Sequence, residues 1–132
     1  TSGTPWLAMN PNFREINVKE QESRPDSVLN YYRKLVALRK APEYKDIFTY
    51  GRFVPLYEDL DDIFAYSRVL EETEEGRSGE IRILANYGKQ SCALTLEKPV
   101  KQVLLSNMET GAKAGQTEVT LDSCQVLVLL TQ

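Results

Sequence analysis

The sequence predicts a mainly β protein: an antiparallel, Greek-key-like sandwich of two sheets, preceded by a long loop and one α-helix. Three observations support this fold class. Seven short runs after residue 44 alternate apolar and polar residues with a period of two, turn residues separate those runs, and a single helical apolar pattern precedes them. Short strands at such regular spacing are typical of a two-sheet sandwich.

The N-terminal segment, residues 1–26, is predicted to be a polar loop. Asn17, with Glu20 three positions later, is a capping pair suited to one short helical turn. A loop this long is uncommon in a compact domain unless it is functional or belongs to something larger.

One helix is predicted over residues 27–40. Asp26 is a suitable N-cap, and Pro42 ends the pattern. Between them, apolar residues recur at three- and four-residue spacing over a wide face, at Val28, Leu29, Tyr32, Leu35, Val36 and Leu38.

The strands that follow share period-two alternation and are bounded by glycine, proline, asparagine or acidic residues. In chain order they are Gly51–Tyr57, Asp62–Leu70, Glu80–Asn86, Ser91–Leu96, Lys101–Ser106, Thr117–Leu121 and Gln125–Leu130.

Composition excludes several classes of site. The chain of 132 residues has no histidine, which rules out within it a Ser–His–Asp triad, a Cys–His pair and a His-ligated metal. Its two cysteines, Cys92 and Cys124, form no CxxC pair, so neither a metal nor a cofactor is expected. A disulfide between them is one alternative, but their apolar, strand-like surroundings favour two buried free thiols.

Charge and hydropathy argue against nucleic-acid and membrane partners. The net charge is −3 and no cluster of Lys or Arg stands out, whereas binding to phosphates needs one. No apolar run has the length of a membrane span, and the first residues do not resemble an export signal. A cytoplasmic location is therefore expected.

Two acidic groups and the aromatic residues are the remaining candidate sites. The run Glu71–Glu75 lacks the alternation of a calcium loop and is predicted to be a solvated hairpin tip. Asp59, Asp61 and Asp62 raise the question of paired carboxylates for glycoside chemistry, but turn residues are the favoured interpretation. The aromatic residues could include a sugar-stacking platform, but packing is the favoured interpretation for Phe13, Tyr31, Tyr32, Phe53, Tyr57, Phe64, Tyr66 and Tyr87. Trp6 is the exception, because it lies in a loop where packing demands are weaker.

The amino-acid sequence resembles those of the oligo-1,6-glucosidases, in the α-amylase family of glycoside hydrolases (family 13). The resemblance is carried by TSGTPWLAMNPNFREINVKEQ, then PDSVLNYYRKLVALRK, and more weakly by DDIFAYSR and ILANYG. It extends over the whole chain, and the first two motifs are the specific ones.

The resemblance implies that the chain is the C-terminal end of a retaining α-glucosidase that cleaves α-1,6 or related α-glucosidic bonds in short oligosaccharides. Residues 1–43 would be the last loop and helix of a (β/α)8 catalytic barrel, and residues 44–132 a C-terminal β-sandwich. The catalytic carboxylates would lie upstream, so this piece is expected to be inactive alone. Its partners would be the parent's own barrel and, for the parent, a small oligosaccharide.

Within the loop, Trp6, Asn10 and Asn12 are the candidates for the rim of the parent's substrate site, and bracing of the loop is the alternative role. Two other functions for the sandwich stay open, a carbohydrate-binding module and an independent protein-interaction domain. Since the helix has a wide apolar face, self-association of the isolated chain is also expected.

Overall fold

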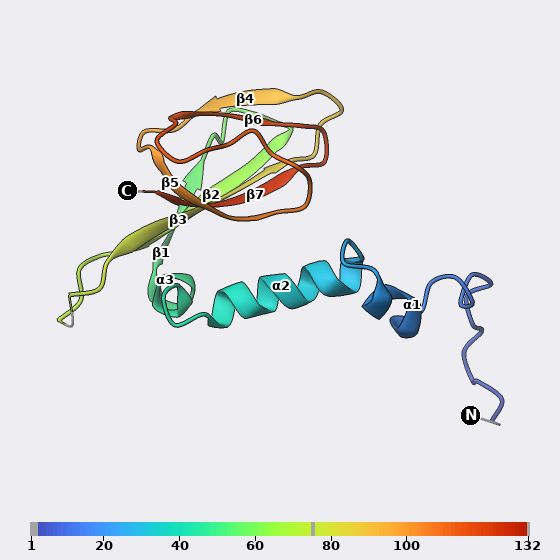
Figure 1. The fold of residues 1–132 in the computed structure, drawn as a ribbon. Coiled ribbons are helices and arrows are strands. Elements are labelled where there is room, and N and C mark those ends of the chain that lie inside the picture. The colour runs from blue at the N-terminus through green and yellow to red at the C-terminus, as the bar shows by residue number, and fades with distance from the viewer. Residues whose placement is uncertain (1–2, 75, 132) are drawn as a thin grey trace. The chain divides into compact units, whose positions relative to one another are not determined.

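The computed structural model describes residues 3–74 and 76–131 of the chain (Figure 1). Thr1 and Ser2 of the first sequence motif, and Glu75 of the acidic run, lie outside the described residues. The chain divides into two compact units, the first ending at Val36 and the second beginning at Ala37. The domain division after residue 43 that the resemblance implies stays a prediction.

Two helices carry the first unit. Helix α1 spans Val18–Ser23 and helix α2 spans Val28–Lys40, which continues into the second unit. The predicted cap of α1 is confirmed, because the Asn17 side chain accepts a hydrogen bond from the Glu20 backbone N–H at 3.0 Å. The predicted helix over residues 27–40 is confirmed as α2.

The N-cap proposed for α2 was wrong by one residue. Ser27, not Asp26, supplies the capping oxygen, because its Oγ accepts the Asn30 N–H at 3.2 Å. Ser27 immediately precedes the first helical residue, where a short side chain reaches the free N–H groups of the first turn. Asp26 is exposed.

All seven predicted strands are present and antiparallel. They are β1 (Arg52–Leu56), β2 (Ile63–Leu70), β3 (Gly79–Asn86), β4 (Cys92–Thr95), β5 (Val100–Ser106), β6 (Glu118–Leu121) and β7 (Val126–Thr131). One sheet has the order β1-β2-β3-β7-β5 and the other pairs β4 with β6. Figure 1 shows the small sheet lying across the large one, which is the predicted two-sheet antiparallel architecture.

The main core fills the space between the two sheets. Along β3 and β7 the even residue Leu84 and the odd residues Leu127 and Leu129 face inward, and all three are fully buried. Leu94 of β4 and Val119 of β6 close the core from the small sheet. Period-two alternation is therefore the pattern that the packing of this sandwich requires.

A second apolar cluster covers part of the outer face of the large sheet. It contains Ile81 and Val128, whose side chains alternate away from the main core, and Ile47 of a further helix, α3 (Lys45–Tyr50). Leu38, near the end of α2, packs against the same cluster. Gly79 permits the close approach, because a Cβ there would lie 2.7 Å from Ile47 Cδ1.

Helix α3 was not predicted. Its six residues, KDIFTY, are too few to show a helical period and include the β-branched Ile47 and Thr49. The helix exists because Ile47, 5% exposed, is buried against β3, which is a tertiary cause.

The cysteine prediction was wrong in placement. Both thiols are free, but Cys124 is exposed and Cys92 is only partly buried. Cys124 lies in the turn before β7 with φ of 59°, so it does not continue the alternation of that strand. Within the described residues, no helix combines the length and the apolar character that a membrane span needs.

Candidate functional site

The three rim candidates lie on the exposed loop of the first unit. Trp6 is 92% exposed, and both Asn10 and Asn12 are exposed. Asn10 Oδ1 accepts the Asn12 N–H at 3.3 Å, and the Asn12 carbonyl accepts N–H groups of Glu15 and Ile16 at 2.9 and 2.8 Å. The two asparagines therefore brace tight turns, whereas Trp6 presents its ring to solvent.

A shallow groove of about 290 Å³ lies on the same unit, and the rim candidates do not line it. Its lining residues come from the end of the loop and the α1–α2 junction, namely Glu15, Ile16, Gln21, Arg24, Asp26, Ser27 and Val28. The structure thus does not gather Trp6, Asn10 and Asn12 around this groove.

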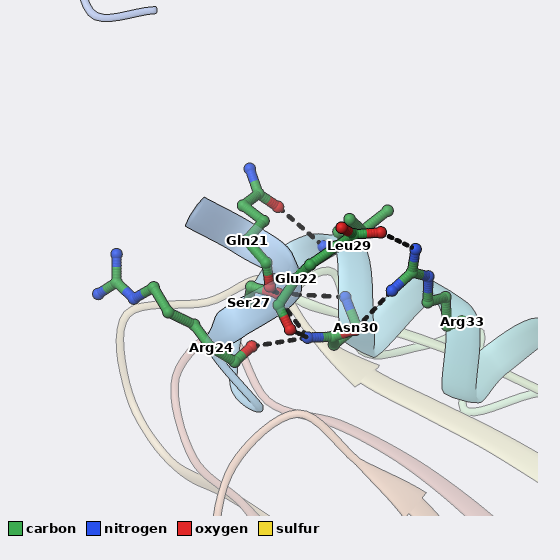
Figure 2. A network of polar contacts seen from close by, with 7 residues as sticks. All are labelled: Gln21, Glu22, Arg24, Ser27, Leu29, Asn30 and Arg33. Atoms are coloured by element: carbon green, nitrogen blue, oxygen red, sulfur yellow. Dashed lines mark hydrogen bonds and ion pairs between the residues drawn. The ribbon is translucent and has the colours of Figure 1, made fainter. Parts of the chain in front are cut away.

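The α1–α2 junction is held by the side-chain amide of Asn30, as Figure 2 shows. Asn30 Nδ2 donates to the carbonyl oxygens of Gln21 at 2.9 Å, Glu22 at 3.3 Å and Arg24 at 2.8 Å. Gln21 and Glu22 lie in the last turn of α1 and Arg24 is its C-cap residue, where the backbone carbonyls have no following helical turn. One amide of α2 thus caps the C-terminal end of α1.

Neighbouring side chains complete this junction. Ser27 Oγ donates to the Gln21 carbonyl at 2.6 Å, and Gln21 Oε1 accepts the Leu29 N–H at 2.9 Å. Arg33 donates to Asn30 Oδ1 at 3.3 Å and pairs with Glu22 at 2.7 Å (Figure 2). Directional hydrogen bonds thus join the two helices, neither of which contains a buried residue.

Sequence reasoning missed Asn30, although a signal was present. Asparagine is unfavourable inside a helix because its amide competes for backbone groups. An asparagine in the first turn of a strongly patterned helix was therefore a candidate for bonding to a neighbouring chain segment.

The only buried acid among the described residues is Glu80, at the end of the main core. Its carboxylate accepts hydrogen bonds from Ser67 Oγ and Arg82 Nε, both at 2.7 Å, and from Lys98 Nζ at 3.0 Å. Burial raises the pKa of Glu80, but the bonds from Ser67, Arg82 and Lys98 outweigh it, so the pKa lies below its usual value. A carboxylate held ionised by three donors is a structural anchor and is poorly suited to general-acid chemistry.

The other acidic candidates are exposed. Asp59, Asp61 and Asp62 lie around the turn between β1 and β2, as the favoured interpretation had it. The described part of the run at residues 71–74 lies exposed in the connection between β2 and β3, where the hairpin tip was predicted. Across residues 3–74 and 76–131, no group of three His, Cys, Asp or Glu side chains is arranged to hold a metal ion.

Three of the aromatic candidates form a row on the outer face of the large sheet. Phe53 of β1 stacks on Tyr66 of β2 with ring centroids 4.9 Å apart, and Phe64 lies 5.7 Å from Tyr66 at 60°. Phe53 and Phe64 are 50% and 53% exposed. We call this row the aromatic row.

The aromatic row borders a groove of about 340 Å³ in the second unit. Its other lining residues are Arg39, Phe48, Thr49 and Arg68. Arg68 Nη2 donates to the carbonyls of Phe48 at 3.2 Å and Thr49 at 3.4 Å, at the end of α3. Among the described residues, its buried Nε–H meets no acceptor. Sequence reasoning missed the arginines, because nothing local in the sequence pairs them with this face.

Comparison with known proteins identifies relatives for both units. The model of the α-amylase catalytic domain matches residues 1–51. The oligo-1,6-glucosidase of Parageobacillus thermoglucosidasius is 33% identical over 125 residues, which cover 92% of this chain and 21% of the relative. The probable oligo-1,6-glucosidase 2 of Bacillus subtilis strain 168 is 40% identical over 111 residues, covering 81% of this chain and 18% of the relative.

Solved structures agree with these relatives. The crystal structure of isomaltulose synthase from Erwinia rhapontici NX5 superposes with a TM-score of 0.85 at 30% identity, over 100% of this chain and 22% of that one. The structure of isomaltulose synthase from Klebsiella sp. LX3 superposes with a TM-score of 0.84 at 28% identity, over 100% of this chain and 22% of that one. The chain spans about a fifth of the length of the proteins it matches. With sequence, motifs and fold in agreement, the chain belongs to the α-amylase family of glycoside hydrolases, with oligo-1,6-glucosidases among its relatives.

Proposed function

We propose that this chain is the C-terminal part of an α-glucosidase that hydrolyses α-1,6 or related α-glucosidic bonds in short oligosaccharides. The observation that carries the proposal is the boundary at residue 51, where the match to the catalytic domain gives way to a β-sandwich. The match to the α-amylase catalytic domain ends there, and the seven strands of the sandwich follow from Arg52 to Thr131.

The sandwich would serve as an accessory domain that stabilises the catalytic part. Support comes from apolar side chains that the chain itself leaves uncovered. In the first unit they include Trp6, Val18, Val28 and Tyr32, which are 92%, 65%, 78% and 65% exposed. Exposed apolar surface of this extent marks a contact with another protein surface.

Catalysis would reside in the part of the parent that this chain does not include. Retaining glycoside hydrolysis needs two carboxyl groups on either side of the scissile bond, one as nucleophile and one as acid/base. Of the acids considered for this role, Asp59, Asp61 and Asp62 are exposed turn residues, and Glu80 is an ionised anchor inside the core. We therefore expect the chain alone to be inactive.

The test is hydrolysis of isomaltose, panose and p-nitrophenyl α-glucoside by the purified chain and by the full-length protein. Activity in the full-length protein and none in the chain is the expected result. Turnover by the chain that disappears with a point mutation within it would refute the assignment of catalysis to the other part.

A carbohydrate-binding module is the second candidate function, and the exposed aromatic row is the observation in its favour. Its rings are not coplanar, because Phe53 stacks against Tyr66 and Phe64 is tilted by 60° from it. A flat sugar face therefore cannot lie on all three. Titration of the chain with isomaltotriose, followed by tyrosine fluorescence, distinguishes the two functions, since only a binding module would saturate.

An independent protein-interaction domain is less well supported, because such a domain would leave little apolar surface in water. Self-association of the isolated chain follows from the same exposed side chains. Sedimentation velocity over a range of concentrations is expected to show dimers or larger species, and a strictly monomeric chain would count against the accessory role.

We also propose a cytoplasmic location for the parent. The support is the pair of free cysteines, since an exposed thiol such as Cys124 persists where the surroundings are reducing. Fractionation of the producing cells, with the parent found among secreted proteins, would refute it.

A further inference from the structure

The aromatic row and the groove beside it lie where the two parts of the family architecture meet. The groove is lined by Arg39, Phe48 and Thr49, which fall inside the catalytic-domain match, and by Phe53, Phe64, Tyr66 and Arg68, which follow it. The surface is therefore built by both parts at once.

We propose that this groove is the docking surface for the remainder of the catalytic domain in the same polypeptide, an inference that rests on the proposed function. About four fifths of the length of the matched proteins lies outside the region that this chain spans, so a partner of sufficient size is available. The inference names the surface of the sandwich that this partner covers.

Part of the outer face of the large sheet is covered by α3 and Leu38, and the part left exposed is also apolar. Helix α3 and Leu38 bury Ile81 and Val128, whereas Phe53 and Phe64 on the neighbouring strands remain about half exposed. The exposed rings extend the same apolar face across β1 and β2, which pair residue by residue. A partner that continued the cover given by α3 would bury them against apolar side chains.

The two arginines define the polar part of the partner. Arg39 and Arg68 line the groove, and Arg68 Nε–H has no acceptor among the described residues. Guanidinium groups bind carbonyl and carboxylate oxygens, so the docked segment should bring such oxygens to the arginine side of the groove. The partner is thus an apolar protein segment with acceptor oxygens at one edge.

Covalent footprinting of aromatic side chains tests the proposal in the 132-residue chain and in the full-length protein. Phe53, Phe64 and Tyr66 are expected to be labelled strongly in the chain and severalfold less in the full-length protein. Tyr87, which is 74% exposed on the turn after β3, is the internal control and should be labelled equally in both. Equal labelling of the aromatic row in both proteins would overturn the proposal.

Two other occupants give different outcomes, and each would overturn it. Protection within the isolated chain that disappears on dilution would mean that a second copy covers the groove. Protection of the chain by isomaltotriose would mean that the groove binds glucan. The footprint is independent of turnover, so an inactive full-length protein with a protected groove would refute the proposed function and leave this inference standing.

A charge in the groove gives a second test. Phe64→Asp should lower the melting temperature of the full-length protein by several degrees more than that of the chain, because only the former loses a buried contact. Tyr87→Asp is the matched control, for which the two shifts should agree. Equal shifts for Phe64→Asp in the two proteins would also contradict the proposal.

Discussion

Between Gly3 and Val36 no described residue is buried, whereas the unit that begins at Ala37 buries two apolar clusters. The first unit is held by hydrogen bonds from Asn17, Ser27 and Asn30 to backbone groups. The second is held by leucine, isoleucine and valine side chains, with Glu80 as its buried ionic anchor. Directional bonds therefore define local geometry in the first unit, whereas independent stability requires the apolar burial of the second.

The largest difference between the two units is expected when each is produced as a separate peptide. Residues 37–132 alone are expected to unfold cooperatively, because both clusters lie within them. Residues 1–36 alone are expected to show no cooperative transition, since a helix shorter than about 12–15 residues is marginal in water. Circular dichroism of both peptides during thermal unfolding tests this, and a cooperative transition in residues 1–36 would contradict it.

A cavity in the core should have the next largest effect. Leu84→Ala removes a fully buried side chain and should lower the free energy of unfolding by about 2–5 kcal/mol. Leu29→Ala, at a partly buried position of α2, is the comparison variant and should lower the free energy of unfolding far less. Urea unfolding measures both, and equal losses would mean that the first unit has a core after all.

Glu80→Gln should lower the free energy of unfolding by about 1–3 kcal/mol at neutral pH, because Arg82 and Lys98 lose their charged partner. The pKa of Glu80 is lowered in the folded state, so its contribution is full above the unfolded pKa and is lost as pH falls through the folded one. The difference between wild type and variant should therefore shrink in acid. Urea unfolding at pH 7 and below pH 4 measures it, and a difference that grows in acid would contradict the assignment.

The smallest global effect is expected for Asn30→Asp, which replaces a donor by an acceptor facing three carbonyl oxygens. The α1–α2 junction should lose about 1–3 kcal/mol locally, while unfolding of the sandwich stays unchanged. Hydrogen exchange at the N–H groups of Glu20, Gln21 and Leu29 should become faster. Lys40→Gln changes the charge equally at the exposed end of α2 and should leave these amides as they are.

The elements with a clear period were predictable from the sequence. Helix α2 and all seven strands follow from apolar spacing, because each buries one face and each face must be apolar. The cap at Asn17 was predictable for a similar reason, since capping depends on neighbours in the chain.

Short and tertiary features were not predictable. Helix α3 is six residues long and depends on Ile47 meeting β3, and Cys124 leaves its strand pattern through a turn with positive φ. Among the three rim candidates, Asn10 and Asn12 form local turns and Trp6 is exposed. Their place on a substrate rim stays a prediction.

Residue order and the spacing of apolar residues over a few positions are enough to locate the strands and the long helix and to recognise the family that the motifs resemble. Only the tertiary structure decided that Asn30 closes the end of α1, that Glu80 lies ionised within the core, and that Phe53, Phe64 and Tyr66 form one exposed row. Each of these needs at least one contact between residues six or more positions apart: Asn30 with Arg24, Glu80 with Ser67, and Phe53 with Tyr66. Such contacts depend on how distant segments pack together, which the local periodicity of apolar residues does not specify.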